Sequence, residues 1–258
     1  MSETIRLRIK FTKHGAIRFI GHLDVMRFFQ KAIRRAEIDI AYTGGFSPHQ
    51  IMSFASPLSV GLESNGEYMD MEVHSLISCE DVKERLNCAS VPGIEVLSVK
   101  LLPKEAGNAM ASVAAASYTV RFREGRAPSL NIASALPDFL SRKEILITKE
   151  TKKGSREVDL KAGIYDICWK GDCFFMLVDA SSAGNIKPAQ IIEALLACHG
   201  ETLQENALLI TREETYCNLG TTEERKLAPL DAVGTEDSER NPSGETVCLR
   251  EETSAHES

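Results

Sequence analysis

Long apolar runs, a signal peptide and closely paired cysteines are all missing from this chain of 258 residues. No segment approaches the roughly 18 consecutive apolar residues of a transmembrane helix, and the charged start M-S-E-T-I-R-L-R-I-K lacks the pattern of a secretion signal. The seven cysteines form no C-x-x-C pair, which argues against a disulfide framework, a zinc knuckle and an iron–sulfur loop. We therefore expect a cytosolic protein whose thiols are reduced and mostly buried.

Nucleotide-binding loops are missing as well. Neither G-x-x-x-x-G-K-[ST] nor a G-x-G-x-x-G that opens a helix occurs, so we expect no cofactor, and nothing indicates a membrane partner. Aromatic residues make up only 6% of the chain, which is few for a platform that stacks single-stranded bases. The apolar share of 43% and the charged share of 26% are typical of a folded globular protein with one or two domains.

Charge is distributed unevenly along the chain. The net charge is −7, yet residues 1–60 hold nine Lys and Arg against four Asp and Glu, whereas residues 218–258 hold four against ten. A cluster of cations in an otherwise acidic chain is typical of a surface that contacts a phosphate backbone, most naturally that of RNA. The alternative is an ordinary solvated charged face.

Apolar periodicity predicts alternating strands and helices. Strands are expected at residues 5–11, 38–42, 67–73 and 94–102, and helices at 22–36 and 78–88. This order is the split βαβ arrangement of a ferredoxin-like domain. A second set repeats it, with strands at 118–122, 145–151, 173–179 and 208–215, helices at 131–141 and 188–200, and an inserted hairpin or turn at 156–170.

The predicted fold is therefore α+β, with two tandem ferredoxin-like domains at residues 1–105 and 106–217. From residue 218 to residue 258 the chain is rich in Thr, Glu, Ser, Gly and Pro without periodicity, so we expect a disordered acidic C-terminal tail. Pro137 falls inside a predicted helix, where it should cause a kink.

The helix expected at residues 22–36 has one apolar face and one cationic face. The cations that share the polar face are Arg27, Lys31, Arg34 and Arg35. On the first strand, Arg6, Arg8 and Lys10 alternate with apolar residues and predict a second basic face. We expect the four helix cations to hold phosphates.

A long connection rich in Gly, Ser and Pro follows at residues 43–67, and long loops within compact domains are often functional. Gly44 and Gly45 permit close backbone approach, and Ser47 lies in the same turn, so these three residues are further candidates for anion binding. Phe46 beside them either is exposed or fills the core.

Four titratable residues are candidates for acid–base chemistry: His22, His49, Asp24 and Glu67. They would act if they converge on one pocket beside Arg34 and Arg35. Asp24 has a simpler explanation as an ion pair with Arg27, one helical turn away. A metal site formed by His22, Asp24 and His49 is poorly supported by their spacing, and we expect no metal.

Several irregular motifs of the N-terminal region resemble one family. They are F-I-G-H-L-D at 19–24, R-R-A at 34–36, G-F-S-P-H at 45–49 and S-F-A-S-P-L-S-V-G-L-E-S at 53–64, with Glu67. The chain resembles the radical SAM-linked proteins, a bacterial family with a domain of unknown function, over about residues 4–215.

This resemblance implies a partner rather than an activity. Members of the family occur beside, or fused to, a radical SAM protein with a cobalamin-type domain, often near genes for a ribonuclease of the G/E type and for ribosomal proteins. The present chain has no cluster of three cysteines that could hold an iron–sulfur centre, so the radical chemistry would belong to the partner.

Three functions remain open at this point. The first is an accessory module that presents RNA or a ribonucleoprotein to the radical SAM partner. The second is an RNA-processing or group-transfer enzyme in which His22 and His49 act as acid and base. The third is a pure protein–protein scaffold, for which Phe46 and Pro57 would matter more than any charge.

Overall fold

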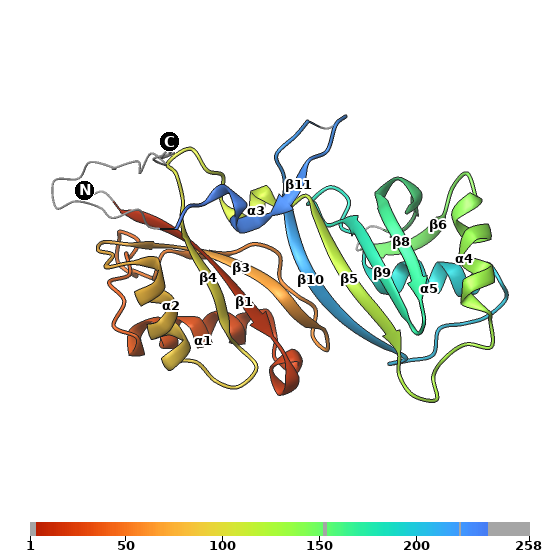
Figure 1. Ribbon diagram of the computed structural model, residues 1–258, viewed down its shortest axis with the longest axis horizontal. Helices are drawn as coiled ribbons and strands as arrows, with labels where there is room; N and C mark the ends of the chain where they lie inside the picture. The colour runs from red at the N-terminus through yellow and green to blue at the C-terminus, as the bar shows by residue number, and fades with distance from the viewer. Residues whose placement is uncertain (1–3, 152–153, 222, 237–258) are drawn as a thin grey trace, which may run out of the picture.

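A computed structural model (Figure 1) describes residues 4–151, 154–221 and 223–236 of the protein. The strands are β1 (Ile5–Lys13), β2 (Met52–Phe54), β3 (Glu63–Val73), β4 (Val96–Leu101), β5 (Ala115–Phe122), β6 (Leu146–Thr151), β7 (Gly154–Asp159), β8 (Ile164–Lys170), β9 (Cys173–Asp179), β10 (Leu208–Asn218) and β11 (Leu227–Pro229). The α-helices are α1 (His22–Arg35), α2 (Cys79–Cys88), α3 (Ala109–Ser112), α4 (Ile132–Ser141) and α5 (Pro188–Ala197). Short 3₁₀ turns are η1 (Gly15–Phe19), η2 (Lys161–Gly163) and η3 (Leu230–Val233).

The fold is α+β, and one mostly antiparallel sheet of nine strands runs through both halves of the molecule (Figure 1). Its central order is β4-β1-β3-β10-β5-β9-β8, with β2 paired to β3 and β11 paired to β10. The two halves meet where β3 and β10 pair in parallel, with Glu63 opposite Thr211 and Ser64 opposite Arg212. We call this junction the seam.

In the N-terminal half, apolar residues from alternate positions of β1 and β3 form the core together with α1 and α2. Leu7 and Ile9 on β1 lie opposite Met71 and Met69 of β3, and both are completely buried, as Phe11 nearly is. The ring of Phe11 packs edge-on against that of Phe29 on α1, with centroids 4.7 Å apart. Ser78 caps α2 as expected, because its Oγ accepts a hydrogen bond from the Asp81 N–H.

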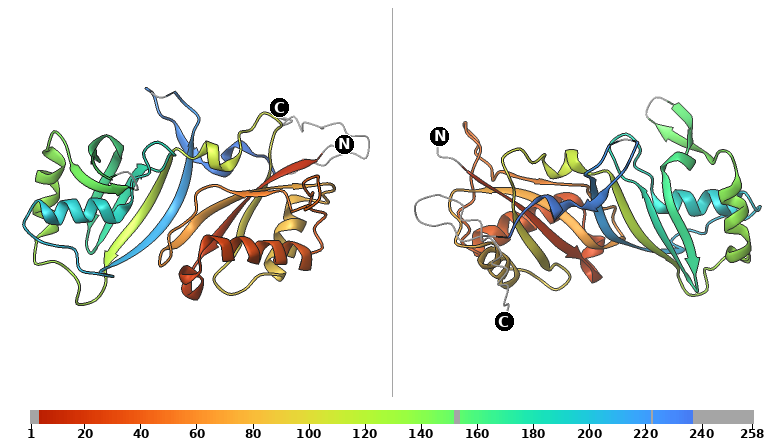
Figure 2. Two further views of the ribbon diagram at one scale, coloured as in Figure 1. Left: turned by 180° about the vertical axis from the view of Figure 1, so that it is seen from behind. Right: turned by 45° about the horizontal axis from the view of Figure 1, so that its top comes forward.

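In the C-terminal half, α4 and α5 cover β5, β8 and β9. Phe174 on β9 and Ile191, Ile192 and Leu195 on α5 are fully buried at the centre of this second core. Helix α5 begins at Pro188. Proline has no N–H, but the N–H groups of a first turn have no partner within the helix, so no helical hydrogen bond is lost. Helices α1, α2, α4 and α5 therefore lie on the same face of the sheet, and the left panel of Figure 2 shows α1 and α5 in front of the strands.

The opposite face of the sheet is covered near the seam by α3, β11 and η3, as Figures 1 and 2 show. Their small apolar core includes Tyr68, Ala109, Val113, Cys217 and Leu230. The prediction of a disordered tail is therefore wrong for the described residues between 218 and 236. Leu230 is completely buried, so this segment has an apolar anchor that its polar composition conceals. Residues 237–258 lie outside the described residues.

Two strand predictions also need correction. Residues 38–42 form no strand and make only isolated bridges, such as Ile40 with Val73. The predicted strand at 145–151 exists as β6, but it pairs with β7 in a separate hairpin. In the main sheet, the position that we expected for residues 145–151 is occupied by β8. Strand β8 comes from the segment 156–170, which the sequence analysis interpreted as an insertion. Strand β8 joins β9 through a turn at Gly171, whose φ of 66° suits glycine.

Candidate functional site

The cationic surface of α1 consists of Arg27, Lys31, Arg34 and Arg35, and all four side chains are exposed. Arg27 forms an exposed ion pair with Asp24 at 3.2 Å, as the sequence suggested. Arg35 donates a hydrogen bond from Nη2 to the Ala89 carbonyl at 2.7 Å. Lys31 and Arg34 make no hydrogen bond or ion pair with any described residue. We call these four residues the α1 cationic face.

A glycine-rich turn at residues 43–49 lies beside this helix. Gly45 has a φ of 100°, which permits the tight turn, and the side chain of Phe46 is completely exposed. The hypothesis that Phe46 fills the core is therefore wrong. Gln50 at the base of the turn donates from Nε2 to the Gln30 carbonyl of α1 at 3.3 Å. This contact fixes the exposed turn next to the α1 cationic face.

The two histidines proposed as acid and base occupy different surroundings. The His22 ring packs edge-on against Phe54, with centroids 5.2 Å apart, at the first turn of α1. The Nδ1 atom of His49 lies 3.1 Å from the Thr43 hydroxyl within the exposed turn. The contact between Gln50 and Gln30 attaches that turn about 12 Å further along the helix than His22, at 1.5 Å per residue. No contact among the described residues joins the two rings.

Glu67, the fourth acid–base candidate, is buried in an ion pair. Its Oε1 atom lies 2.9 Å from Nη1 of Arg212 on β10, and both side chains are less than one-tenth exposed. Burial lowers the pKa of the neighbouring Lys13, while the charge of Glu67 raises it in part. The ammonium group of Lys13 donates to the Ile20 carbonyl at 3.1 Å, just before α1. Glu67 therefore lies in a buried charge cluster at the seam with Lys13 and Arg212, and no described contact links it to His22 or His49.

The basic face predicted for the first strand is not a free surface. Arg8 is completely buried and binds both carboxylate oxygens of Asp70, at 2.7 and 2.9 Å. Arg6 donates to the Ala106 carbonyl, and Lys10 pairs with Glu214 at 2.5 Å. Because β1 lies inside the sheet and α3 and η3 cover this face, these cations are bound to the protein itself. Of the two basic faces that the sequence predicted, the one on α1 is therefore the one whose described cations remain exposed to a partner.

Polar residues missed by the sequence analysis complete the covered face of the seam. The Tyr68 hydroxyl donates to Glu214 at 2.8 Å and lies 3.3 Å from Asp231. Burial and these two carboxylates raise the pKa of Tyr68 well above its ordinary value, so the phenol stays protonated. Asp231 also accepts a hydrogen bond from Ser98 at 2.6 Å. The consecutive charges of Arg212, Glu213 and Glu214 within a predicted strand are the signal that could have revealed this seam.

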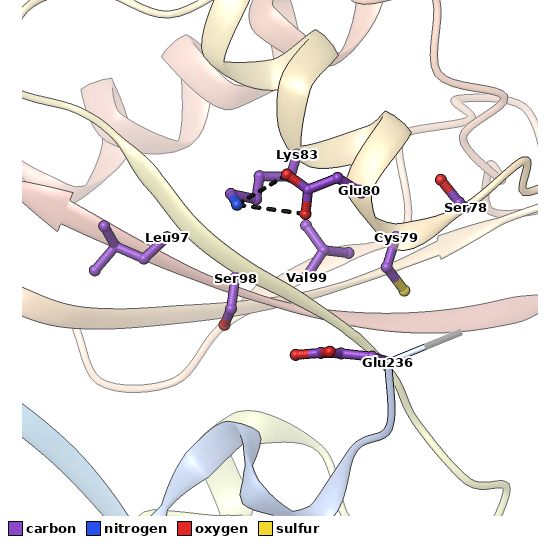
Figure 3. A pocket seen from close by; sticks show the side chains of 8 residues that line it. All are labelled: Ser78, Cys79, Glu80, Lys83, Leu97, Ser98, Val99 and Glu236. Carbon is purple, nitrogen blue, oxygen red and sulfur yellow. Dashed lines mark hydrogen bonds and ion pairs between the residues drawn. The ribbon is translucent and has the colours of Figure 1, made fainter. Parts of the chain in front are cut away.

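A small cavity of about 240 Å³ lies between the N-terminus of α2 and the edge strand β4 (Figure 3). Its lining includes Glu80 and Lys83, which pair with each other at 3.0 Å. Glu236, at the end of the described C-terminal segment, closes one side and binds Lys100 at 2.5 Å. The charged groups of this cavity therefore already have protein partners.

The described residues contain no group of three or more His, Cys, Asp and Glu side chains placed to hold a metal ion. Among the helices in the described ranges, none has the length and apolar character needed to cross a membrane.

Comparisons with known proteins give one family. A family model described as "Uncharacterized protein conserved in bacteria (DUF2344)" matches residues 6–188. No curated protein matches the chain. The solved structure titled "Crystal Structure of an Unknown Protein from Galdieria sulphuraria" is 12% identical, covers 82% of this chain and 98% of its own, and has a TM-score of 0.25. This structural similarity is too weak to support an argument.

Proposed function

The chain belongs to this conserved bacterial family, and on that premise we propose that it is an accessory protein that binds RNA through the α1 cationic face and presents it to a partner enzyme. The observation that carries the proposal is the pair Lys31 and Arg34. Both are exposed on one side of α1, and neither has a partner among the described residues. Cations that are not used within the protein are free to replace the counterions of a phosphate backbone.

The spacing of the cations suits a polyanion rather than a single small ion. Arg27, Lys31 and Arg34 follow one another at intervals of four and three residues, so they lie along one side of the helix. A row of charges about two turns long matches the repeated phosphates of a nucleic acid backbone. The exposed turn with Gly44, Gly45 and Ser47 would extend the contact beyond the helix.

The partner in this proposal is a radical SAM protein with a cobalamin-type domain. Its support is the resemblance of the motifs at 19–24, 45–49 and 53–64. The exposed ring of Phe46 suits a protein contact, because an isolated aromatic side chain gains stability when a partner covers it. In this arrangement the radical chemistry takes place on the partner.

The architecture that we propose for this function is two ferredoxin-like units joined at the seam. In the N-terminal half the order β4-β1-β3, with β2 at β3, supports this interpretation. In the C-terminal half the order β10-β5-β9-β8 supports it as well. Residues 1–105 and 106–217 would then be the two units, and the β6–β7 hairpin would be an insertion in the second.

The test is a salt titration of RNA binding. We would measure fluorescence anisotropy of a labelled RNA hairpin with the wild-type protein and with the double variant Lys31→Ala, Arg34→Ala. Loss of two phosphate contacts should lower the slope of log K against log salt by about 1.4 to 1.8. Affinity should fall at low salt, while the unfolding midpoint should not change.

A matched control removes the same charge elsewhere. Arg142 and Lys143 follow α4 and are also exposed, so the double variant Arg142→Ala, Lys143→Ala changes the net charge equally. It should retain the wild-type salt slope. The proposal fails if both double variants lose affinity equally, or if the wild-type protein binds the hairpin without a salt dependence.

A further inference from the structure

A second cavity, of about 300 Å³, lies on the helical face of the sheet at the seam. One wall is the segment from Ser56 to Leu62, which belongs to the motif at 53–64 that the proposed RNA contact leaves unexplained. The opposite wall is the start of α5, with Ile186 and Pro188. Tyr118, Ile210 and Arg212 from the sheet also line it, so both halves of the chain contribute to this cavity.

Arg212 brings an incompletely used guanidinium group to the cavity. Its side chain is only 6% exposed. Nη1 donates to Glu67 at 2.9 Å and to the Ser56 carbonyl at 2.8 Å, and Nε lies 3.3 Å from the Tyr118 hydroxyl. Nη2 makes no hydrogen bond with any described residue. Two N–H groups of a buried cation are therefore left for a ligand, and hydrogen bonds to ionised groups are the strong ones in such surroundings.

The charges behind the cavity are not balanced. One carboxylate, Glu67, pairs with Arg212 and also interacts electrostatically with Lys13, and all three residues are more than nine-tenths buried. Burying a charge without an opposite charge is costly. Burial is the main cause that lowers the pKa of Lys13; the charge of Glu67 raises this pKa and the charge of Arg212 lowers it. An anion in the cavity would offset the excess of positive charge.

Two further donors lie at the cavity rim. Lys187, just before α5, adds an exposed cation. The N–H of Ala189 is in the first turn of α5, where N–H groups have no partner within the helix and favour negative charge. Apart from Ser59 and Asn185, the remaining walls are apolar, with Pro57, Leu58 and Ile210. The cavity thus combines an anion-binding end with an apolar body.

We propose that the seam cavity binds a small organic anion that has an apolar body and a single carboxylate or phosphate head group. Arg212 Nη2 and the rim donors hold the head group, and the 56–62 segment covers the apolar part. The volume of about 300 Å³ is that of a small-metabolite pocket and excludes a nucleotide chain. The site is separate from the α1 cationic face and does not depend on RNA binding.

The experiment uses three probes of similar size on the full chain: benzoate, phenyl phosphate and benzyl alcohol. Binding would be measured by isothermal titration calorimetry and by saturation-transfer NMR. We expect at least one anionic probe to bind with a Kd below about 10 mM, and the neutral alcohol to bind at least about tenfold more weakly. The tighter of the two anions identifies the head group that the site prefers.

Variants place the binding in the cavity. Ser59 lines it and is exposed, so Ser59→Trp should fill the opening without disturbing the core, and anion binding should fall about tenfold or more. Val60 is 57% exposed in the same loop and does not line the cavity, so Val60→Trp is the matched control and should bind like the wild type. Lys187→Gln should weaken the anions severalfold and leave the alcohol unchanged.

Three outcomes would overturn the proposal: neither anion binds below about 10 mM, the alcohol binds as well as the anions, or the two tryptophan variants behave alike. The double variant Lys31→Ala, Arg34→Ala should bind the anionic probes like the wild type. This last measurement separates a failure of the cavity from a failure of the RNA proposal.

Discussion

Arg212 on β10 and Glu67 on β3 form a buried ion pair, with 2.9 Å between Nη1 and Oε1, at the place where the two halves of the sheet meet. The pair joins residues that are 145 positions apart in the chain. It gives Glu67 a structural role where the sequence had suggested acid–base chemistry. The stability of the seam should therefore depend on both charges being present.

Glu67→Gln should destabilise the protein strongly, because it leaves the guanidinium of Arg212 buried without its carboxylate. The loss should be about 3 to 5 kcal/mol, as for other buried pairs from which one partner is removed. Urea unfolding followed by circular dichroism measures it. The double variant Glu67→Gln, Arg212→Met should recover part of the loss. A double variant that is less stable than the single one would contradict this account.

Arg8→Met should also be strongly destabilising, although the sequence placed Arg8 on a free basic face. Arg8 is completely buried, and its removal leaves Asp70 as an unpaired buried carboxylate, so we expect a loss of about 3 to 5 kcal/mol. Arg27→Met is the control, because the Arg27 side chain is 65% exposed. It should change the free energy of unfolding by less than about 0.5 kcal/mol. Equal effects of the two substitutions in chemical denaturation would refute the assignment.

Glu63 should make the stability of the protein dependent on acid pH. Burial raises the pKa of Glu63, but hydrogen bonds from the Gly15 N–H, His14 and Arg18 outweigh this effect, and the pKa lies below its usual value of 4.5. A depressed pKa in the folded state stabilises the protein above the unfolded-state pKa, and the contribution is lost as the pH falls through the folded-state value.

The substitution Glu63→Gln tests this dependence. At pH 7 it should cost about 1 kcal/mol, because charge-assisted hydrogen bonds are lost at a partly exposed site. At a pH below the folded-state pKa the variant and the wild type should unfold at the same denaturant concentration. Glu80→Gln, at a carboxylate that is 64% exposed, should have little effect at either pH. A pH-independent difference would show that the charge of Glu63 is not responsible.

Leu230→Ala should show that the segment following β10 is part of the fold. Leu230 is completely buried, so its truncation should cost about 2 to 4 kcal/mol. Leu219→Ala is a matched control, because Leu219 is 50% exposed, and it should cost less than about 0.5 kcal/mol. Thermal unfolding compares the midpoints of the two variants. Equal midpoints would mean that burial of Leu230 does not stabilise the protein.

Phe46→Ser should separate partner binding from folding. The side chain is fully exposed, so the unfolding midpoint should not change, and RNA binding should be retained. Recovery of the proposed radical SAM partner in a pull-down from the native host should decrease. Unchanged recovery would remove Phe46 from the proposed contact. Leu219→Ser, at a side chain 50% exposed at the start of the connection between β10 and β11, is the control.

The sequence predicted those helices and helix starts that are determined by residues close together in the chain. The amphipathic period identified α1 and its cations, Ser78 marked the start of α2, and Pro188 marked the start of α5. These features depend on side chains within a few positions of one another, so one segment is sufficient to identify them.

Features that depend on distant partners were not predictable in this way. Arg8 has the alternating pattern of an exposed basic strand, and only α3 and η3, far along the chain, show why it is buried. Leu230 is a single apolar residue in a polar segment. Arg212 contacts Glu67 because β3 and β10 pair in parallel. No sequence pattern within either strand predicts that they pair with each other. The seam is therefore a result of tertiary contacts.

The central place of β10 in the sheet has a consequence for how the chain folds. Asn65 donates to Glu213 across the seam, and the two residues are 148 positions apart, while Arg8 donates to the Leu230 carbonyl 222 positions away. Contacts of such sequence separation form slowly because a long loop must close first. During synthesis, the edge of β3 that pairs with β10 therefore lacks this neighbour until the chain has been made as far as β10, about 150 residues later.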